Sequence, residues 1–75
     1  MNRAYLASSM MASVGYDPST RILEIEFTTG AVYHYLDVPL ELYNDLLEAP
    51  SHGRFFHSRI RRTFTHHRIT KFSAQ

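Results

Sequence analysis

The sequence predicts an α+β domain, with a three-stranded antiparallel β-meander and two C-terminal helices packed on one face. Three observations lead to this prediction. Apolar and polar residues alternate with a period of two through much of the first half of the chain, as is typical of strands. Turn-forming residues interrupt the alternation, and apolar residues then recur at helical spacing. With 75 residues, the chain forms one domain with a small core and marginal stability.

The first expected hairpin turns at residues 17–20. Its apolar face consists of Met10, Ala12, Val14 and Tyr16 on one strand and Leu23, Ile25 and Phe27 on the other. Asp17 and Pro18 favour a type I turn, because proline pre-sets φ at the second position and the aspartate accepts hydrogen bonds from the turn backbone. We expect Tyr16 to pair with Arg21, a register that keeps the apolar residues on one face.

The second expected hairpin turns at Thr28-Thr29-Gly30, and its loop length decides which way the next strand faces. A three-residue loop with Gly30 in the left-handed conformation, a G1 bulge, sets Tyr33 and Tyr35 on the core face. A two-residue turn would set both rings on the open face, since a one-residue slip turns every side chain over. We favour the longer loop because Gly30 fits its last position and His34 then points outward.

Two helices are expected after the sheet. Pro39, at the first helical position, opens the first helix, and Pro50 ends it. Its apolar stripe consists of Leu40, Tyr43, Leu46 and Leu47. Ser51 caps a second helix that runs to about Arg62. Its inward residues are Phe55, Phe56 and Ile60.

The outward side of the second helix carries three basic or titratable residues at positions i, i+3 and i+7. They are Arg54, His57 and Arg61. Arg59 falls on the apolar side by the same count. Its stem should therefore cover the core, and its guanidinium should reach Asp45 or Glu48.

An ordered set of short motifs runs through most of the chain. Its parts are Ser9–Asp17 (SMMASVGYD), Leu23–Phe27 (LEIEF), Gly30 with Tyr33-His34-Tyr35, Val38-Pro39, Tyr43, Leu46, Ser51-x-Gly53-Arg54-Phe55-Phe56 and Ile60-Arg61. This set resembles the KTSC domain family, which occurs at the C-terminus of some lysyl-tRNA synthetases and as small stand-alone bacterial and phage proteins. The resemblance covers about Ser8 to Phe64. It implies a single domain over residues 1–75, with a core at about 8–64, and it suggests an RNA-binding role.

Charge divides the chain in two. Residues 1–50 hold two arginines and all seven acidic residues, whereas residues 51–75 hold six basic residues and no acidic one. The periodicity ends after Thr63, so we expect residues 65–75 to form a flexible basic tail. A basic segment interleaved with phenylalanines is typical of a protein that binds nucleic acid, because phosphates attract the cations and bases stack on the rings.

We therefore expect a non-catalytic nucleic-acid-binding module whose partner is RNA in preference to DNA. The candidate binding residues are Arg54, His57, Arg61, Arg62, Arg68 and Lys71, with Tyr33 and Tyr35. The two tyrosines have a second interpretation, in which their rings close the core. The alternative function is a protein-interaction module that docks an acidic partner or self-associates through its oppositely charged halves.

Composition argues against several other classes. The chain has no cysteine, so it forms neither disulfides nor thiolate zinc sites, and we expect a cytoplasmic protein. The spacing of its five histidines gives no metal site, and we expect no cofactor and no small-molecule substrate. No nucleophile and base stand at a spacing that indicates catalysis, so we do not expect an enzyme. The apolar run at residues 6–14 is too short to span a membrane.

Overall fold

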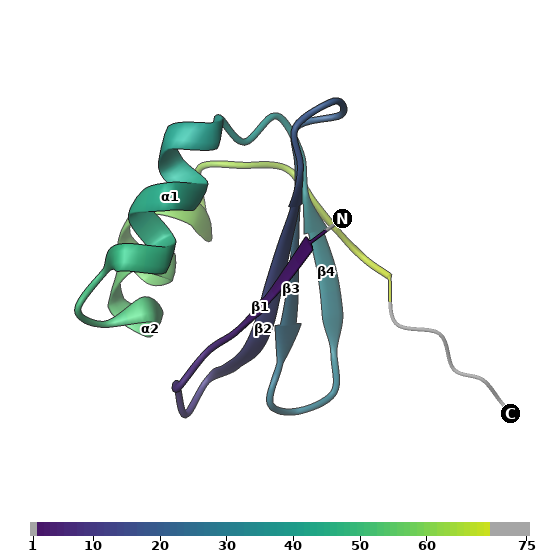
Figure 1. The fold of residues 1–75 in the computed structure, drawn as a ribbon. Coiled ribbons are helices and arrows are strands. Elements are labelled where there is room, and N and C mark those ends of the chain that lie inside the picture. Colours follow the sequence, from purple (N-terminus) through teal and green to yellow (C-terminus); the bar gives the residue numbers. More distant parts are fainter. Residues whose placement is uncertain (1, 70–75) are drawn as a thin grey trace, which may run out of the picture.

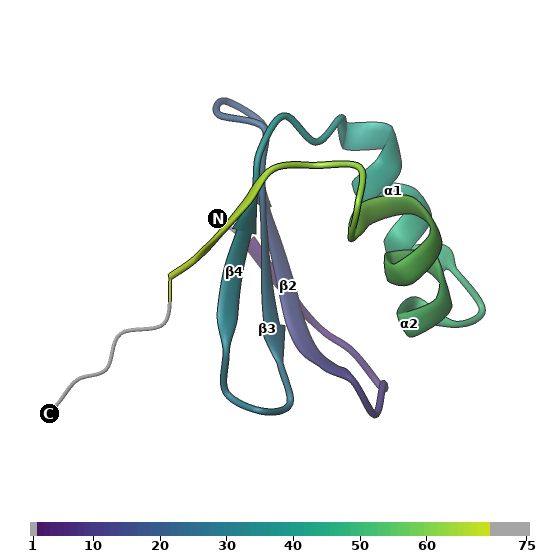
Figure 2. The same cartoon turned by 180° about the vertical axis from the view of Figure 1, so that it is seen from behind.

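Five antiparallel strands form one sheet, and the helical residues cover one of its faces (Figure 1). This architecture comes from a computed structural model that describes residues 2–69. The strands, in their order across the sheet, are β1 (Asn2–Tyr5), β2 (Met11–Asp17), β3 (Ile22–Phe27), β4 (Val32–Tyr35) and β5 (His66–Arg68). The helical layer consists of α1 (Leu40–Glu48), α2 (His52–Phe55) and the π-helix η1 (Phe56–Ile60). The chain leaves the sheet after β4, forms the helices and returns beside β4 as β5 (Figure 2).

The α+β class and the helical layer on one face are confirmed, but the expectation of three strands is wrong. Both edge strands, β1 and β5, were missed. Each is short, four residues in β1 and three in β5, so neither shows a clear alternation. The residues of β5 were expected to belong to a flexible tail. They form a strand because their backbone pairs with β4, and two further bonds flank it, from Leu36 N–H to Thr65 O and from Ile69 N–H to Val32 O.

The first hairpin exists, but its register differs from the expected one. Tyr16 pairs with Leu23 and not with Arg21. Arg21 lies in the loop with φ 60°, and its N–H donates to the carbonyl oxygen of Asp17 at 2.7 Å. The Asp17 carboxylate accepts from the Ser19 N–H at 3.0 Å, as expected for an aspartate that opens a turn. The shift leaves the apolar residues of both strands on one face, because it moves the pairing by an even number of residues.

A β-bulge at Ala12 decides which residue enters the core at the start of β2. Met11 pairs with Phe27 and Ser13 with Glu26, so Ala12 is the extra residue on its strand. Met11 is consequently fully buried, whereas Met10 and Ala12 are half-buried. The prediction that Ala12 occupies an inward position is wrong, whereas Met10 packs against the core without being fully buried.

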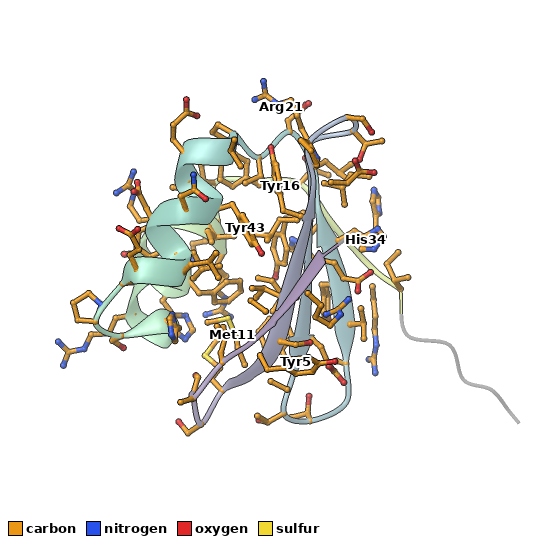
Figure 3. All side chains as sticks on the ribbon, viewed as in Figure 1. Tyr5, Met11, Tyr16, Arg21, His34 and Tyr43 are labelled. Atoms are coloured by element: carbon orange, nitrogen blue, oxygen red, sulfur yellow. The ribbon has the colours of Figure 1, made fainter. Side chains whose placement is uncertain are left out.

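The second hairpin is confirmed. Gly30 has φ 95°, its N–H donates to Phe27 O at 2.9 Å, and the Phe27 N–H donates to Ala31 O at 2.8 Å. These bonds close a three-residue loop with glycine in the left-handed position. Tyr35 consequently faces the core, while His34 lies on the opposite face of the sheet, away from the helices (Figure 3).

The core lies between the sheet and the helices. Its buried apolar residues are Met11, Val14, Tyr16, Leu23, Ile25, Tyr35, Val38, Leu42, Leu46, Phe56 and Ile60. Tyr16 anchors α1 to the sheet, because its ring stacks on Tyr43 and its hydroxyl donates to Val38 O at 2.5 Å (Figure 3). Within residues 2–69, no helix has the length and apolar character needed to cross a membrane.

The start of α1 differs from the prediction by one residue. Pro39 is the N-cap, with an extended backbone, and the helix begins at Leu40. Leu42 lies one turn before Leu46 and is buried with it, whereas Leu40 is 49% exposed. Leu40 therefore does not belong to the apolar stripe of α1.

Candidate nucleic-acid interface

A π-turn changes the face that each residue of the second helical segment presents. Ser51 caps α2, as expected, with its hydroxyl oxygen accepting from the Arg54 N–H at 3.2 Å. The helix then widens, and the Arg61 N–H donates to Phe56 O, five residues earlier, at 2.9 Å. A wider turn rotates the following residues around the helix axis. The three residues expected on one side of the helix therefore line two different hollows of the surface. His57 and Arg61 line one hollow, and Arg54 lines the other.

The larger of these hollows is a cavity of about 380 Å³ between η1 and the β3 to β5 side of the sheet. Its aromatic walls are Phe27, Tyr33, Tyr35 and Phe56. Three groups that carry or can take positive charge also line it, namely His57, Arg61 and His66, and Met10 completes the lining. Four of the predicted binding residues thus meet in one place although they come from two separate segments of the chain: Tyr33, Tyr35, His57 and Arg61.

The rings of the cavity form a continuous cluster. Tyr35 lies 5.6 Å from Phe56 and 5.3 Å from His66, measured between ring centroids. Tyr33 lies 5.6 Å from His66 and 5.8 Å from Phe27. These distances are typical of interacting aromatic pairs, so the cluster holds its walls in place before any ligand arrives.

Tyr35 is the most buried polar residue of this cluster. Its side chain is only 3% exposed, and burial raises the pKa of its hydroxyl to about 12, with a further contribution from Tyr33. Arg61 acts in the opposite direction and lowers that pKa, which indicates that its guanidinium lies within electrostatic reach of the hydroxyl. The hydroxyl is therefore protonated at neutral pH and can donate a hydrogen bond.

The open face of the sheet carries a polar network. Glu24 of β3 forms an ion pair with Arg3 of β1 and contacts His34 of β4, with 2.8 Å between His34 Nε2 and Glu24 Oε1. Ser13 donates to Glu26 at 2.7 Å on the same face. The register that would have placed both tyrosines of β4 on this face is wrong. Tyr35 closes the core, and Tyr33 is half-buried at the cavity.

The remaining predicted binding residues lie around the cavity or apart from it. Arg62 is exposed just after η1, and Arg68 of β5 pairs through its backbone with Tyr33. Arg54 lines the second hollow, beside Phe55. Lys71 lies outside the described residues.

Arg59 does not make the ion pair that the helical count predicts. It is exposed, and its guanidinium carbon lies 5.5 Å from the ring centroid of Phe55. Arg59 lies within the π-helix, where the regular helical count used for the prediction does not apply. A contact of this kind between an exposed arginine and a ring contributes on the order of 0.5–1 kcal/mol.

Sequence reasoning missed the part that His66 and Phe27 play in the cavity. His66 stands in β5, a strand that was not predicted, and Phe27 was assigned to the core alone. The sequence carries no alternation that would have predicted β5, since its three residues are all polar and exposed. Among residues 2–69, no group of three or more histidine, cysteine or acidic side chains is arranged to hold a metal ion.

Comparison with known proteins places these residues in context. The KTSC domain profile matches residues 7–64. An uncharacterized protein from Stutzerimonas stutzeri is 54% identical over 56 residues, which are 75% of this chain and 79% of that protein. The crystal structure of a KTSC domain protein from Yersinia pestis matches with a TM-score of 0.88 at 40% identity, covering 91% of this chain and 96% of that one.

A similar segment also occurs within a much longer protein. A lysine–tRNA ligase from Nostoc sp. is 36% identical over 62 residues, which are 83% of this chain and 11% of the ligase. The segment therefore stands alone in some proteins and forms a small part of others.

Proposed function

The chain belongs to the KTSC domain family, and on that premise we propose that it is a small, non-catalytic nucleic-acid-binding module that prefers RNA to DNA. The observation that carries the proposal is the cavity, which combines aromatic walls with Arg61 and His57. These two residues belong to a stretch, residues 51–75, that holds six basic residues and no acidic one. Rings stack on bases, and cations attract the phosphates that join them.

The preference for RNA rests on the shape of the site and on one relative. A cavity takes an unpaired base, and unpaired bases in loops and ends are what most sequence-reading RNA-binding proteins recognise. The Nostoc sp. relative is named a lysine–tRNA ligase, so a similar segment accompanies a protein that acts on an RNA. We propose a cytoplasmic protein that binds RNA without a cofactor.

The basic residues divide into two roles in this proposal. Arg61 and His57 contact the nucleotide that enters the cavity, because they line it. The exposed residues Arg54, Arg62 and Arg68 attract the strand at longer range.

Two measurements test the proposal. Protein purified without nuclease should retain nucleic acid, which raises the ratio of absorbance at 260 nm to that at 280 nm. The change is easy to detect because the chain has no tryptophan. Protein freed of nucleic acid and checked for folding should then bind a fluorescently labelled single-stranded 12-nucleotide RNA at 50 mM salt, as measured by anisotropy.

A matched pair of variants locates the interface. Arg61→Gln and Arg54→Gln remove the same charge from exposed positions, but only Arg61 lines the cavity. We expect Arg61→Gln to weaken RNA binding about tenfold and Arg54→Gln to weaken it about twofold to threefold, on the scale of one charged contact. Absence of binding to RNA and DNA at 50 mM salt would refute the proposal and favour the alternative of a module that docks an acidic protein or self-associates.

A further inference from the structure

We propose that the cavity between η1 and β4 receives one unstacked nucleobase, with the phosphate of the same nucleotide held at its rim by Arg61 and His57. This inference rests on the proposed function and specifies the ligand of that site. The ligand that this site would bind is a flat heteroaromatic ring that carries a phosphate. An RNA strand and a free mononucleotide could both supply it.

The size of the cavity suits one nucleotide. Its volume of about 380 Å³ lies near the lower end of the roughly 300–1,000 Å³ that small-ligand sites occupy. A base pair within a duplex could not enter, because both bases would have to leave their stack together. Recognition at this site therefore requires a base that is already unpaired or has been turned outward.

The walls provide stacking surfaces. Tyr33 is half-buried and His66 is exposed, and their ring centroids lie 5.6 Å apart at the β4 to β5 side of the cavity. Phe56 stands on the η1 side, 5.6 Å from Tyr35 and nearly perpendicular to it. A base that enters the cavity can therefore stack on at least one of these rings.

Tyr35 provides a polar group among the residues that line the cavity. The residue is only 3% exposed, and burial raises the pKa of its hydroxyl, which is therefore protonated at neutral pH. A protonated hydroxyl is a hydrogen-bond donor for the ring nitrogens and carbonyl oxygens along the edge of a base.

The charge of the rim suits a phosphate. Arg61 and His57 are both exposed and line the same cavity. Arg61 and Tyr35 line the same cavity, so one nucleotide bound there could contact both residues. No acidic residue lines the cavity, so nothing there repels an anion.

The test measures binding of three RNA probes and one mononucleotide to the intact protein at 50 mM salt. The probes are a single-stranded uridine hexamer, a single-stranded adenosine hexamer and a six-base-pair RNA duplex, and the mononucleotide is adenosine 5′-monophosphate. We expect the better hexamer to bind at least tenfold more tightly than the duplex. Binding of the duplex as tight as that of both hexamers would overturn the inference.

Tyr35→Phe is the decisive variant, because it deletes the hydroxyl and retains the ring in the core. We expect it to weaken hexamer binding about fivefold, the effect of one hydrogen bond. Tyr16→Phe is its matched control, since the Tyr16 hydroxyl is also buried but donates to Val38 O away from the cavity. This control should lower stability and leave the affinity of the folded protein unchanged.

His66→Ala should weaken binding about tenfold through lost stacking.

Backbone amide shifts in two-dimensional NMR spectra provide a second measurement that does not depend on a variant. Bound hexamer should shift the amides of residues 33–35, 56–61 and 66, and leave those of β1 unchanged.

The outcomes separate this inference from the proposed function. Hexamer binding that neither Tyr35→Phe nor His66→Ala alters would overturn the inference while RNA binding stands. Tight binding of the mononucleotide without binding of any RNA would support the cavity and refute the RNA proposal.

Discussion

At the scale of single residues, Tyr35 connects the core with the candidate site. Its ring packs against Phe56 and His66, and the residue lines the cavity. Burial raises the pKa of this hydroxyl to about 12, above the ordinary value of 10.0. The folded protein therefore favours the neutral form of Tyr35 more strongly than the unfolded chain does, which couples stability to pH.

This coupling predicts an alkaline loss of stability. Because the pKa is raised on folding, the stabilising contribution of the neutral hydroxyl is fully present below pH 10 and is lost as the pH rises toward 12. A shift of about two units corresponds to at most about 2–3 kcal/mol, and screening by solvent reduces this figure. Urea unfolding of the wild type should show most of this loss between pH 10 and 12. Tyr35→Phe should show a smaller loss over the same range, and equal losses in the two proteins would contradict the assignment.

Ser13 joins the polar network of the open face. It is fully buried, accepts a hydrogen bond from Arg3 Nη1 at 2.7 Å and donates one to Glu26 Oε1 at 2.7 Å. Ser13→Ala removes the partner of two charged groups at once, so it should lower the free energy of unfolding by about 1–3 kcal/mol. Denaturant titration measures the change.

The control for this prediction is Ser58→Ala. Ser58 is exposed, and its hydroxyl donates a long bond of 3.4 Å to Phe55 O. Its replacement should change stability by less than about 0.5 kcal/mol. Equal effects at the two serines would show that the network of the open face does not stabilise the fold.

At the scale of elements, two glycines provide a matched comparison. Gly30 has φ 95° and closes the hairpin between β3 and β4, so alanine there should destabilise by about 1–2 kcal/mol even though no atom obstructs its side chain. Gly53 lies in α2, and an alanine Cβ would meet only Met10 Sδ at 3.5 Å, an ordinary contact. Gly53→Ala should therefore leave stability unchanged or raise it by up to about 1 kcal/mol. Thermal and urea unfolding of both variants should show a loss of stability for Gly30→Ala and no loss for Gly53→Ala. Equal losses in the two variants would contradict the different roles assigned to the two glycines.

The elements that the sequence predicts correctly are those specified by local chemistry. Gly30 requires a left-handed position, Asp17 bonds its own turn, and Ser51 caps a helix; each depends on residues only a few positions away. The class of fold and the face on which Tyr35 lies follow from such local choices.

The elements that the sequence does not predict depend on distant partners. The strand β5 is polar throughout and exists only through pairing with β4. The bulge at Ala12 is decided by the partner strand β3, and the π-turn of η1 by packing of Phe56 and Ile60 into the core. None of these features leaves a period in the sequence, so pattern reading could not find them.

The candidate site also combines features that follow from local sequence with features that depend on distant elements. Tyr33 and Tyr35 are placed by a correctly predicted loop, and the density of arginines is the basis of the proposed partner class. The separation of Arg54 from Arg61 follows from the π-turn, and the entry of His66 follows from β5. The types of residue in the site could therefore be predicted, whereas their exact grouping required the positions of remote elements.

At the scale of the whole molecule, charge is separated along the chain. All seven acidic residues lie in the sheet, α1 and their connections, and six of the eight basic residues follow residue 50. In the proposed function, the basic residues of η1, β5 and the segment between them attract a polyanion. Long-range attraction should then supply much of the affinity, and salt should weaken it.

The last prediction concerns that salt dependence. If Arg54, Arg61, Arg62 and Arg68 together make about four phosphate contacts, affinity for single-stranded RNA should fall by roughly 1.5–2 orders of magnitude between 50 and 200 mM salt. Arg61→Gln combined with Arg62→Gln should reduce the logarithmic slope by about half. Truncation after Ile69 keeps the bond from Ile69 N–H to Val32 O and removes only Lys71 among the basic residues. Because Lys71 is not one of these four arginines, the truncation should leave the slope nearly unchanged. Anisotropy titrations at four salt concentrations measure each slope. A slope near zero in the wild type would mean that stacking alone holds the RNA, and the charge separation would then need another explanation, for which docking of an acidic protein is the first to test.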